Sequence, residues 1–190
     1  MGEITGVVLA GGLGRRMGGV DKGLVPLQGK AMVAHVLERL VPQVDELLVN
    51  ANQNLEHYAA FGYRVIPDNL LGYAGPLAGL QTGLSEAAND LVATVPCDSP
   101  FLPLDLIARL QTALLEQKAQ LAVAKTLSQA HPVFCLCRRS LLPHLTSFLD
   151  AGGRRFEAWY ADLKTVEVNF DDQVDAFKNI NTPQQLAAEN

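Results

Sequence analysis

Residues 4–22 read ITGVVLAGGLGRRMGGVDK, an apolar run that passes directly into a glycine-rich, basic segment. The apolar part, residues 4–10, is short and rich in β-branched side chains, which is typical of a strand buried on both faces. Glycine permits positive φ angles and lets backbone N–H groups approach a ligand closely. We therefore expect a buried first strand whose end opens into a ligand-binding loop.

Periodicity alternates between strand and helix through the first two-thirds of the chain. The apolar patterns predict strands over 46–49, 63–66 and 91–95, and helices over 32–40, 76–88 and 103–117. Such alternation is typical of a mostly parallel sheet with helices on both faces. The sequence therefore predicts a Rossmann-like α/β fold.

The last third of the chain changes character. The patterns predict strands over 121–125, 133–137 and 166–168, and a helix over 141–150. Residues 177–181 are expected to form a further strand that leads into a closing helix, with Thr182 as its cap and Pro183 in its first turn. No internal repeat or linker interrupts the 190 residues, so we expect one domain over 1–190.

The composition is that of a globular protein, with 48% hydrophobic and 18% charged residues. The net charge of −5 argues against a general nucleic-acid binder, which would present a basic face. No apolar run approaches the roughly 18 residues of a membrane-spanning helix, and the apolar stretch near the N-terminus is too short for a signal peptide. We therefore expect a cytoplasmic protein without nucleic-acid or membrane partners.

The chain has three cysteines, Cys97, Cys135 and Cys137. An odd number without C-x-x-C spacing fits neither a disulfide framework nor a zinc site. Cys135 and Cys137 would share one face of a strand. We expect all three to be buried, reduced thiols.

The loop after the first strand combines five glycines with Arg15, Arg16 and Lys22. Consecutive N–H groups in such a turn form an anion-binding nest, and the basic side chains add positive charge. These features indicate a polyphosphate site. The loop is not a Walker A motif, because Gly29-Lys30 is followed by Ala31 rather than Ser or Thr.

A dinucleotide fingerprint is also disfavoured. Met17 stands where the third glycine or alanine of that motif belongs, and Asn50 rather than an acidic residue ends the second strand. These departures argue against a Rossmann oxidoreductase.

Ligands of open parallel sheets bind beyond the carboxyl ends of the strands. The residues expected there are Gly11 and Gly12, Asn50, Asp68 and Asp98. Asp98 suits a Mg²⁺ ion, which takes one or two carboxylates plus phosphate oxygens, although it could instead cap the helix near 103. Asp68 is either a nucleotide-binding or supporting group, or a simple turn former after Pro67.

The pattern L-A-G-G-x-x-x-R-M-G-x-x-x-K resembles the signature of nucleotidyltransferases, and the full loop resembles that of the molybdenum cofactor guanylyltransferase family. Further blocks similar to that family follow in the same order, from end to end of the chain: VNAN at 49–52, IPD at 66–68, GPLAGL at 75–80, PCDSP at 96–100, HPVF at 131–134 and NINTP at 179–183. One departure is Leu13-Gly14, where the family often has a polar residue after the glycine pair.

The resemblance implies a single domain of the nucleotide-diphospho-sugar transferase type. It implies transfer of GMP from GTP, with Mg²⁺, to the terminal phosphate of molybdopterin, with release of pyrophosphate. It assigns nucleotide binding to about residues 1–120 and acceptor binding to about 121–190. The implied nucleotide-binding residues are Leu9, Ala10, Gly11, Gly12, Lys22, Asn50, Asp68 and Asp98. The implied catalytic residues are Arg16, Lys22 and Asp98, with the metal on Asp98, and the implied acceptor-binding residues are Gly19, Arg155, Asn179 and Asn181.

The acceptor is a phosphate monoester, which is mostly dianionic at neutral pH because its second pKa is about 6. No general base is then needed, and we interpret His131 as structural or acceptor-contacting. Arg154-Arg155 could instead be a solvated basic pair. Asn179 and Asn181, which would share a strand face, could instead stabilise the turn that leads into the closing helix.

Three alternatives to the guanylyltransferase stay open. Two are transferases, a CTP-dependent molybdopterin cytidylyltransferase and a sugar-phosphate nucleotidyltransferase. Within the resemblance, Leu-Ala-Gly-Gly favours guanine over cytosine. The third is a non-catalytic nucleotide-binding module, against which the presence of both Lys22 and Asp98 argues. The sequence does not determine the oligomeric state; a monomer with transient contacts to other molybdenum cofactor proteins is the working expectation.

Overall fold

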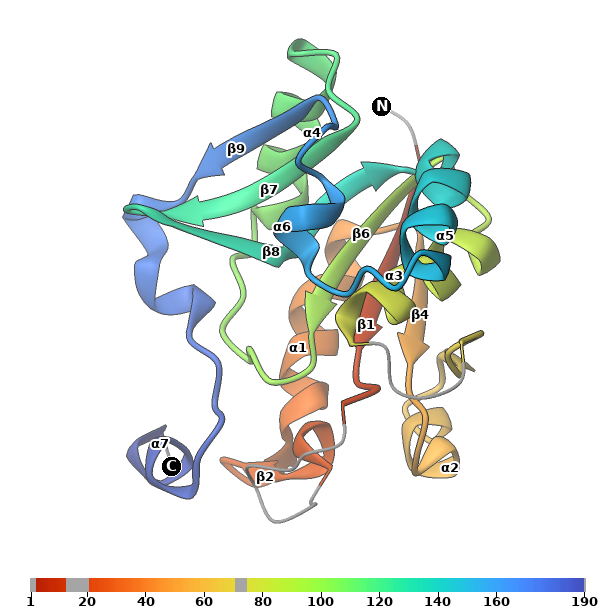
Figure 1. The fold of residues 1–190 in the computed structure, drawn as a ribbon. Helices are drawn as coiled ribbons and strands as arrows, with labels where there is room; N and C mark the ends of the chain where they lie inside the picture. Colours follow the sequence, from red (N-terminus) through yellow and green to blue (C-terminus); the bar gives the residue numbers. More distant parts are fainter. Residues whose placement is uncertain (1–2, 13–20, 71–74, 190) are drawn as a thin grey trace.

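The computed structural model describes residues 3–12, 21–70 and 75–189, and within these ranges a seven-stranded sheet forms the middle layer (Figure 1). The strand order is β5-β4-β1-β6-β8-β7-β9, and β8 alone runs antiparallel to its neighbours in this described sheet. The strands are β1 Ile4–Leu9, β4 Glu46–Asn50, β5 Arg64–Ile66, β6 Leu91–Pro96, β7 Leu121–Thr126, β8 Gln129–Arg138 and β9 Thr165–Asn169. The predicted mostly parallel α/β sheet is confirmed.

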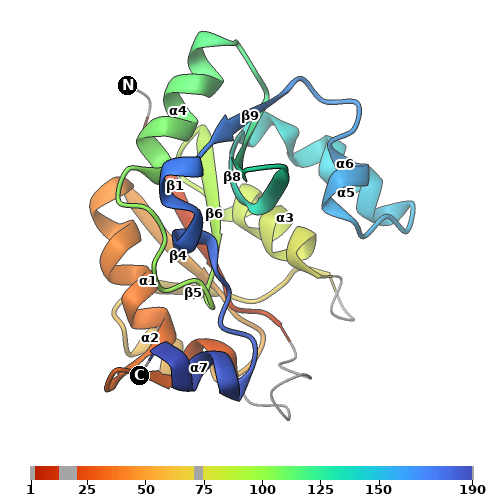
Figure 2. The same cartoon turned by 90° about the vertical axis from the view of Figure 1, so that its left-hand side faces the viewer.

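Helices cover both faces of this sheet (Figure 2). On one face lie α1 Met32–Leu40 and α4 Leu106–Glu116, and on the other lie α3 Pro76–Glu86, α5 Leu142–Asp150 and α6 Phe156–Trp159. Two shorter helices, α2 Leu55–Ala59 and α7 Pro183–Glu189, lie near the end of the molecule toward which β1, β4 and β6 point (Figure 1). No helix within the described ranges combines the length and apolar character needed to cross a membrane.

Short elements complete the described chain. The strands β2 Pro26–Leu27 and β3 Lys30–Ala31 form a small hairpin below the sheet in Figure 1. The 3-10 turns are η2 Lys22–Leu24, η3 Val41–Gln43, η4 Arg139–Leu141 and η5 Asp171–Phe177.

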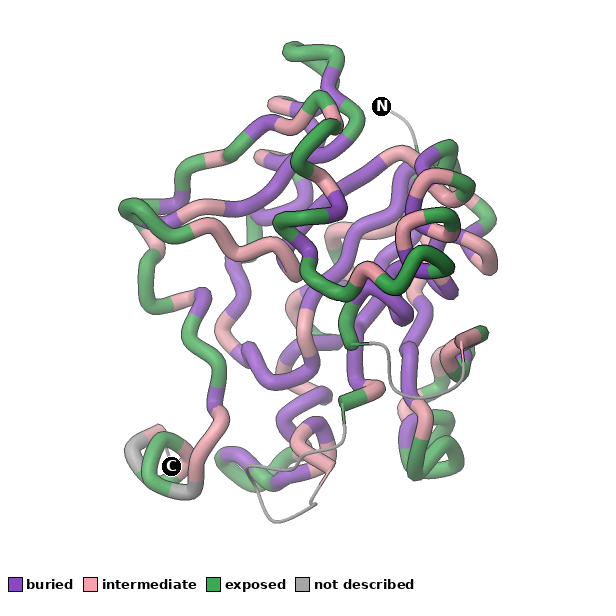
Figure 3. The backbone as a smooth tube through the Cα atoms, viewed as in Figure 1, coloured by how far each residue is buried: buried purple, intermediate pink, exposed green. Residues whose placement is uncertain are grey.

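Two apolar layers hold the helices against the sheet. Because side chains of a strand alternate between faces, Val8 of β1 joins the layer under α1 and α4, whereas Val7 and Leu9 join the layer under α3 and α5. The strands β1, β4, β6 and β7 are accordingly buried along most of their length, whereas β5, β8 and β9 have more half-buried and exposed residues (Figure 3). This explains why the first strand has no polar alternation.

Several predicted boundaries needed correction. The helix expected from 103 begins at Leu106, because residues 99–105 form turns first, with Leu102 N–H donating to Ser99 O and Leu106 N–H to Pro103 O. The strand expected over 133–137 starts earlier, at Gln129, because it forms a hairpin with β7. The predicted cap of the last helix is confirmed, since Gln185 N–H donates to Thr182 Oγ1 at 3.2 Å.

The strand expected over 177–181 is wrong. Phe177 ends the turn η5, and the residues after it pair with no strand of the described sheet. Instead, the backbone N–H of Ile180 donates to the carbonyl of Asp98 at 2.9 Å. Asn179 and Asn181 therefore do not share a strand face; Asn179 bonds to Ser99 just after β6, whereas Asn181 bonds to Lys22 on η2.

Candidate active site

The carboxyl ends of β1, β4, β5 and β6 meet at one edge of the sheet, as predicted. From β1 the chain adds β4 and then β5 on one side and β6 on the other, so the order reverses at β1. Backbone pairing continues past the strand ends: Ala10 N–H donates to Asn50 O at 2.7 Å and Cys97 N–H to Leu9 O at 3.1 Å. A ligand-binding crevice is typical of such a reversal point.

An amide–carboxylate cluster occupies the β4–β5 side of this edge. Asn50 is buried, and its Nδ2 donates to Asp68 Oδ1 at 2.8 Å. Asn52 Nδ2 donates to Asp68 Oδ2 at 2.8 Å and to the carbonyl of Gly11 at 3.3 Å, while Asp68 N–H donates back to Asn52 Oδ1 at 2.8 Å. Asp68 is thus bound on both carboxylate oxygens, which is more than a turn former requires.

Asn52 is the member of this cluster that the sequence reasoning missed. It belongs to the block VNAN at 49–52, yet it stands two residues beyond the strand end that marked Asn50. Its amide links residues that follow β1 and β5 across the intervening β4. The available signal was the second asparagine at spacing two, which places both side chains on one side of an extended segment.

Two glycines are required here by close packing. A Cβ at Gly11 would lie 2.7 Å from Asn52 Nδ2. A Cβ at Gly79, in the first half of α3, would overlap Asn50 Oδ1 and lie 2.8 Å from Leu9 Cδ2. The helix α3 can therefore approach the end of β1 and the Asn50 amide only because position 79 lacks a side chain.

On the β6 side of the edge, Lys22 and Asp98 form an ion pair. Lys22 Nζ lies 3.3 Å from Asp98 Oδ2 and also donates to Asn181 Oδ1. Asp98 is 8% exposed, and burial raises the pKa of its carboxyl group while the Lys22 ammonium opposes that rise. The lysine ammonium of this pair can neutralise phosphate charge directly, whereas the carboxylate can contribute only by holding a metal ion.

The C-terminal segment is attached to the same strand end. Ser99 Oγ donates to Asn179 Oδ1 at 2.6 Å, next to the Ile180–Asp98 backbone bond. The structure therefore brings Asn179 and Asn181 to the Lys22–Asp98 pair, across more than 75 residues of sequence. The alternative of Asp98 as a helix cap is wrong, because α4 begins at Leu106 with Asp105 in the cap position.

The remaining predicted site residues divide into two groups. Leu9, Ala10, Gly11 and Gly12 lie at the end of β1, as expected, whereas Arg15, Arg16 and Gly19 fall outside the described residues. Arg155 is exposed at the start of α6, and within the described ranges its guanidinium forms no ion pair. Nothing in the described chain connects Arg155 to the Lys22–Asp98 pair. Its neighbour Arg154 donates to the carbonyls of Leu149 and Gly153.

His131 and the cysteines lie among packed side chains. His131 Nε2 lies 2.6 Å from Thr126 Oγ1, its ring stacks on Phe177 at a centroid distance of 4.8 Å, and burial lowers its pKa. The three cysteines are buried and free, which confirms that prediction. Burial raises the pKa of each thiol, that of Cys135 to about 11, so all are protonated at neutral pH.

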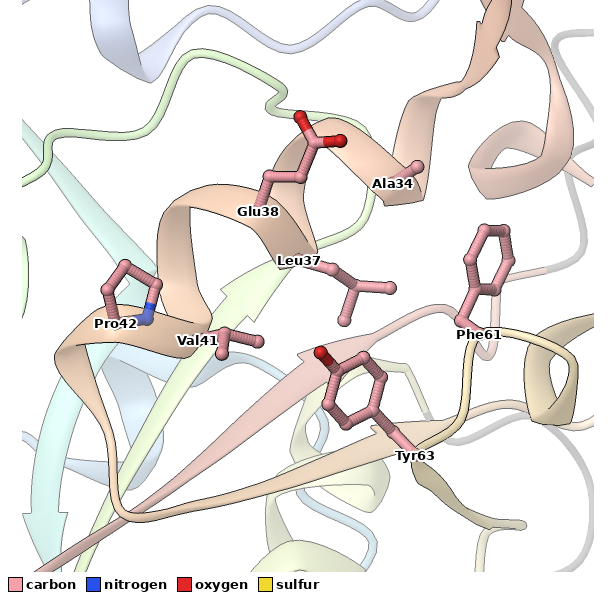
Figure 4. Close-up of a pocket in the computed structure, with 7 residues that line it drawn as sticks. All are labelled: Ala34, Leu37, Glu38, Val41, Pro42, Phe61 and Tyr63. Carbon is pink, nitrogen blue, oxygen red and sulfur yellow. The ribbon is translucent and has the colours of Figure 1, made fainter.

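A surface hollow of about 260 Å³ lies elsewhere, on the outer side of α1 (Figure 4). It is lined by Ala34, Leu37, Glu38, Val41, Pro42, Phe61 and Tyr63. Its acid, Glu38, is bonded to Lys30 at 2.6 Å. The hollow contains none of the strand-end residues described above.

Comparisons with known proteins agree with this geometry. The chain is 49% identical to a molybdenum cofactor guanylyltransferase from Shewanella sp. (strain MR-4), over 98% of this chain and 96% of the relative. It is 52% identical to a protein of the same name from Bordetella petrii, over 97% of this chain and 95% of the relative.

Solved structures share the fold at lower identity. Molybdopterin-guanine dinucleotide biosynthesis protein A from Archaeoglobus fulgidus superposes with a TM-score of 0.83 at 23% identity, covering 97% of this chain and 96% of its own. The 2-C-methyl-D-erythritol 4-phosphate cytidylyltransferase from Thermus thermophilus gives a TM-score of 0.70 at 17% identity, covering 96% and 95%. Residues 6–166 match the family described as MobA-like NTP transferase domain, and the chain belongs to that family.

Proposed function

We propose that this chain transfers GMP from GTP to the terminal phosphate of molybdopterin, releasing pyrophosphate and forming the guanine dinucleotide form of the molybdenum cofactor. The observation that carries the proposal is the Lys22–Asp98 pair, which lies at the end of β6. The Asn50–Asn52–Asp68 cluster lies on the other side of the same edge. High identity to curated guanylyltransferases supports the choice of nucleotide and acceptor.

The nucleotide-binding role belongs to the β1, β4 and β5 ends. The base and ribose lie over Leu9, Ala10 and Gly11, within reach of Asn50 and Asp68. The triphosphate lies on the backbone that begins at Gly11 and Gly12, where N–H groups stabilise negative charge. Selectivity for a base requires polar groups in fixed positions, and the mutual bonds of the cluster provide that rigidity.

Asp98 fits a divalent cation, Mg²⁺ in this proposal. It is an oxygen ligand, largely buried, and already pairs with a positive group. Within the described ranges no cluster of three or more His, Cys, Asp or Glu side chains could hold a metal alone, so phosphate oxygens and water would complete the coordination, as is usual for Mg²⁺. When bound, the ion supplies neutralisation of phosphate charge.

The transfer needs in-line positioning and charge stabilisation rather than a strong base. An oxygen of the acceptor phosphate attacks the α-phosphorus of GTP; a P–O bond forms to the acceptor as the bond to pyrophosphate breaks. Lys22 stabilises the charge that develops on the phosphates, and we assign the same role to Arg16. The Lys22 ammonium bonds to both Asp98 and Asn181, and these bonds direct it to the β6 side of the crevice.

We assign acceptor binding to Gly19, Arg155, Asn179 and Asn181, and more broadly to about residues 121–190. The contacts of Asn179 with Ser99 and of Asn181 with Lys22 support an acceptor position next to the reacting phosphates. We further propose that the chain works as a cytoplasmic monomer, with transient contacts to other molybdenum cofactor proteins.

The test is pyrophosphate release with each of the four nucleoside triphosphates and Mg²⁺, with and without molybdopterin. We expect release with GTP only, and only when molybdopterin is present. Release with CTP instead would favour a cytidylyltransferase, and release with a sugar phosphate as acceptor would favour a sugar nucleotidyltransferase. Tight GTP binding without release under any condition would favour a binding module.

A further inference from the structure

Lys22 lies on the short turn η2. Asp21, the residue before it, accepts hydrogen bonds on both of its carboxylate oxygens. Tyr58 Oη donates to Asp21 Oδ1 at 2.5 Å, and Asn54 Nδ2 donates to Asp21 Oδ2 at 3.0 Å. The carbonyl of Asp21 accepts the N–H of Leu24 at 3.1 Å, which closes the turn around Lys22. Asp21 thus joins the Lys22 turn to α2.

The partner of Asp21 is itself fixed in the core. Tyr58 is fully buried among the apolar side chains between the sheet and α1. Burial raises the pKa of its phenol, so the hydroxyl keeps its proton and donates to the carboxylate. Asn54 precedes α2 with a φ of 52°, a left-handed conformation that asparagine tolerates better than most residues.

Close packing fixes the turn from a second side. A Cβ at Gly23 would lie 2.5 Å from Tyr58 Oη and 3.3 Å from Cys97 Sγ. Cys97 directly precedes Asp98, the ion-pair partner of Lys22. The turn therefore lies between Tyr58 and the end of β6, and the hydroxyl that binds Asp21 also occupies the space that a side chain at position 23 would need.

We propose that Asp21 and Tyr58 are positioning residues for the transfer reaction: they hold the Lys22 turn against the end of β6 and so set where the Lys22 ammonium meets the nucleotide phosphates. The proposal rests on the proposed function for the role of Lys22 at those phosphates. Neither residue contacts the nucleotide. A cation that stabilises developing charge is effective only in a fixed position, so a looser turn lowers turnover more than it weakens ground-state binding.

The first test is Tyr58→Phe, which keeps the ring and removes the hydroxyl. We expect kcat to fall about tenfold, as for the loss of one hydrogen bond to a charged group, with the Kd for GTP–Mg²⁺ within about twofold of its normal value. Asp21→Ala removes both acceptors and is expected to lower kcat about 30-fold. Tyr63→Phe is the matched control, because that half-buried phenol lines the hollow beside α1, which holds none of the strand-end residues; its kcat should be unchanged.

A second test uses the contact at Gly23. Gly23→Ala alone should lower kcat because the new methyl group displaces the Tyr58 hydroxyl. In the Tyr58→Phe background that hydroxyl is absent, so adding Gly23→Ala should cost less than it does in the normal chain. This non-additivity reports on the proposed contact, and it does not follow from a general loss of stability.

The outcomes separate the two proposals. If the normal chain releases no pyrophosphate from GTP and molybdopterin, the proposed function fails before any variant is compared. If the normal chain is active and Tyr58→Phe and Asp21→Ala keep its kcat, the positioning role is wrong. It is also wrong if the variants lose GTP affinity at unchanged kcat. Should Tyr58→Phe fail to fold by circular dichroism, the same readouts on Asp21→Asn, which keeps one acceptor oxygen, decide the matter.

Discussion

Replacing Asn181 with alanine tests whether the C-terminal segment acts on Lys22 or only on the acceptor. The substitution removes the amide oxygen that accepts a hydrogen bond from the Lys22 ammonium, and leaves Asp98 as that ammonium's remaining described partner. The backbone bond from Ile180 N–H to Asp98 O does not depend on the Asn181 side chain and keeps the segment anchored to the end of β6.

The expected magnitude follows from the charge and exposure of Lys22. Hydrogen bonds to charged groups contribute about 1.5–3 kcal/mol, but the Lys22 side chain is 23% exposed and water can replace part of the lost bond. We therefore take the lower end, about 1.5 kcal/mol, which corresponds to about a tenfold loss of kcat/KM for GTP.

The assay is steady-state pyrophosphate release, with separate titrations of GTP–Mg²⁺ and molybdopterin. Asn179→Ala is the matched control, because it removes the same kind of amide two residues away and its partner is Ser99 rather than Lys22. We expect Asn181→Ala to lower turnover at saturating concentrations of both substrates, and Asn179→Ala to act mainly on acceptor affinity. If Asn181→Ala raises only the KM for molybdopterin, the bond to Lys22 has no measurable role and the reasoning is refuted.

Four further substitutions address the two sides of the crevice. Asp98→Asn should abolish Mg²⁺-dependent turnover with a Tm within a few degrees of normal, because burial already disfavours the charged carboxylate; turnover and thermal unfolding decide this, and near-normal activity contradicts the metal assignment. Gly79→Ala should destabilise the fold by about 1–3 kcal/mol in urea unfolding, since its methyl group would overlap the Asn50 amide. Gly12→Ala, with open space around the added carbon, should leave stability unchanged. Asn52→Ala should weaken GTP binding about tenfold in calorimetry by releasing Asp68; unchanged affinity and unchanged preference over ATP would remove Asn52 from base recognition.

The sequence alone was sufficient for the sheet, both helical layers and one row of site residues. Apolar periodicity is a local property, so the strands around Val7 and Val92 and the helix that starts at Met32 could be assigned from short windows. Parallel strands end at a common edge, so Asn50, Asp68 and Asp98 could be placed together without coordinates.

The tertiary structure alone decided which side chains contact one another at that edge. The spacing of Asn52 from Asn50 puts it on the right side of the segment but does not identify its bond to Asp68, and Tyr58 carries no sequence signal for its bond to Asp21. Both bonds depend on how neighbouring strand ends and α2 are arranged in space. The prediction of a strand at 177–181 is wrong for the same reason. The backbone donor of Ile180 is satisfied by the end of β6 rather than by the sheet edge, and an extended segment has the same local pattern in either place. Lys22 and Asn181 are separated by 159 residues, so their contact is determined by the packing of the whole domain and not by any local preference of the chain.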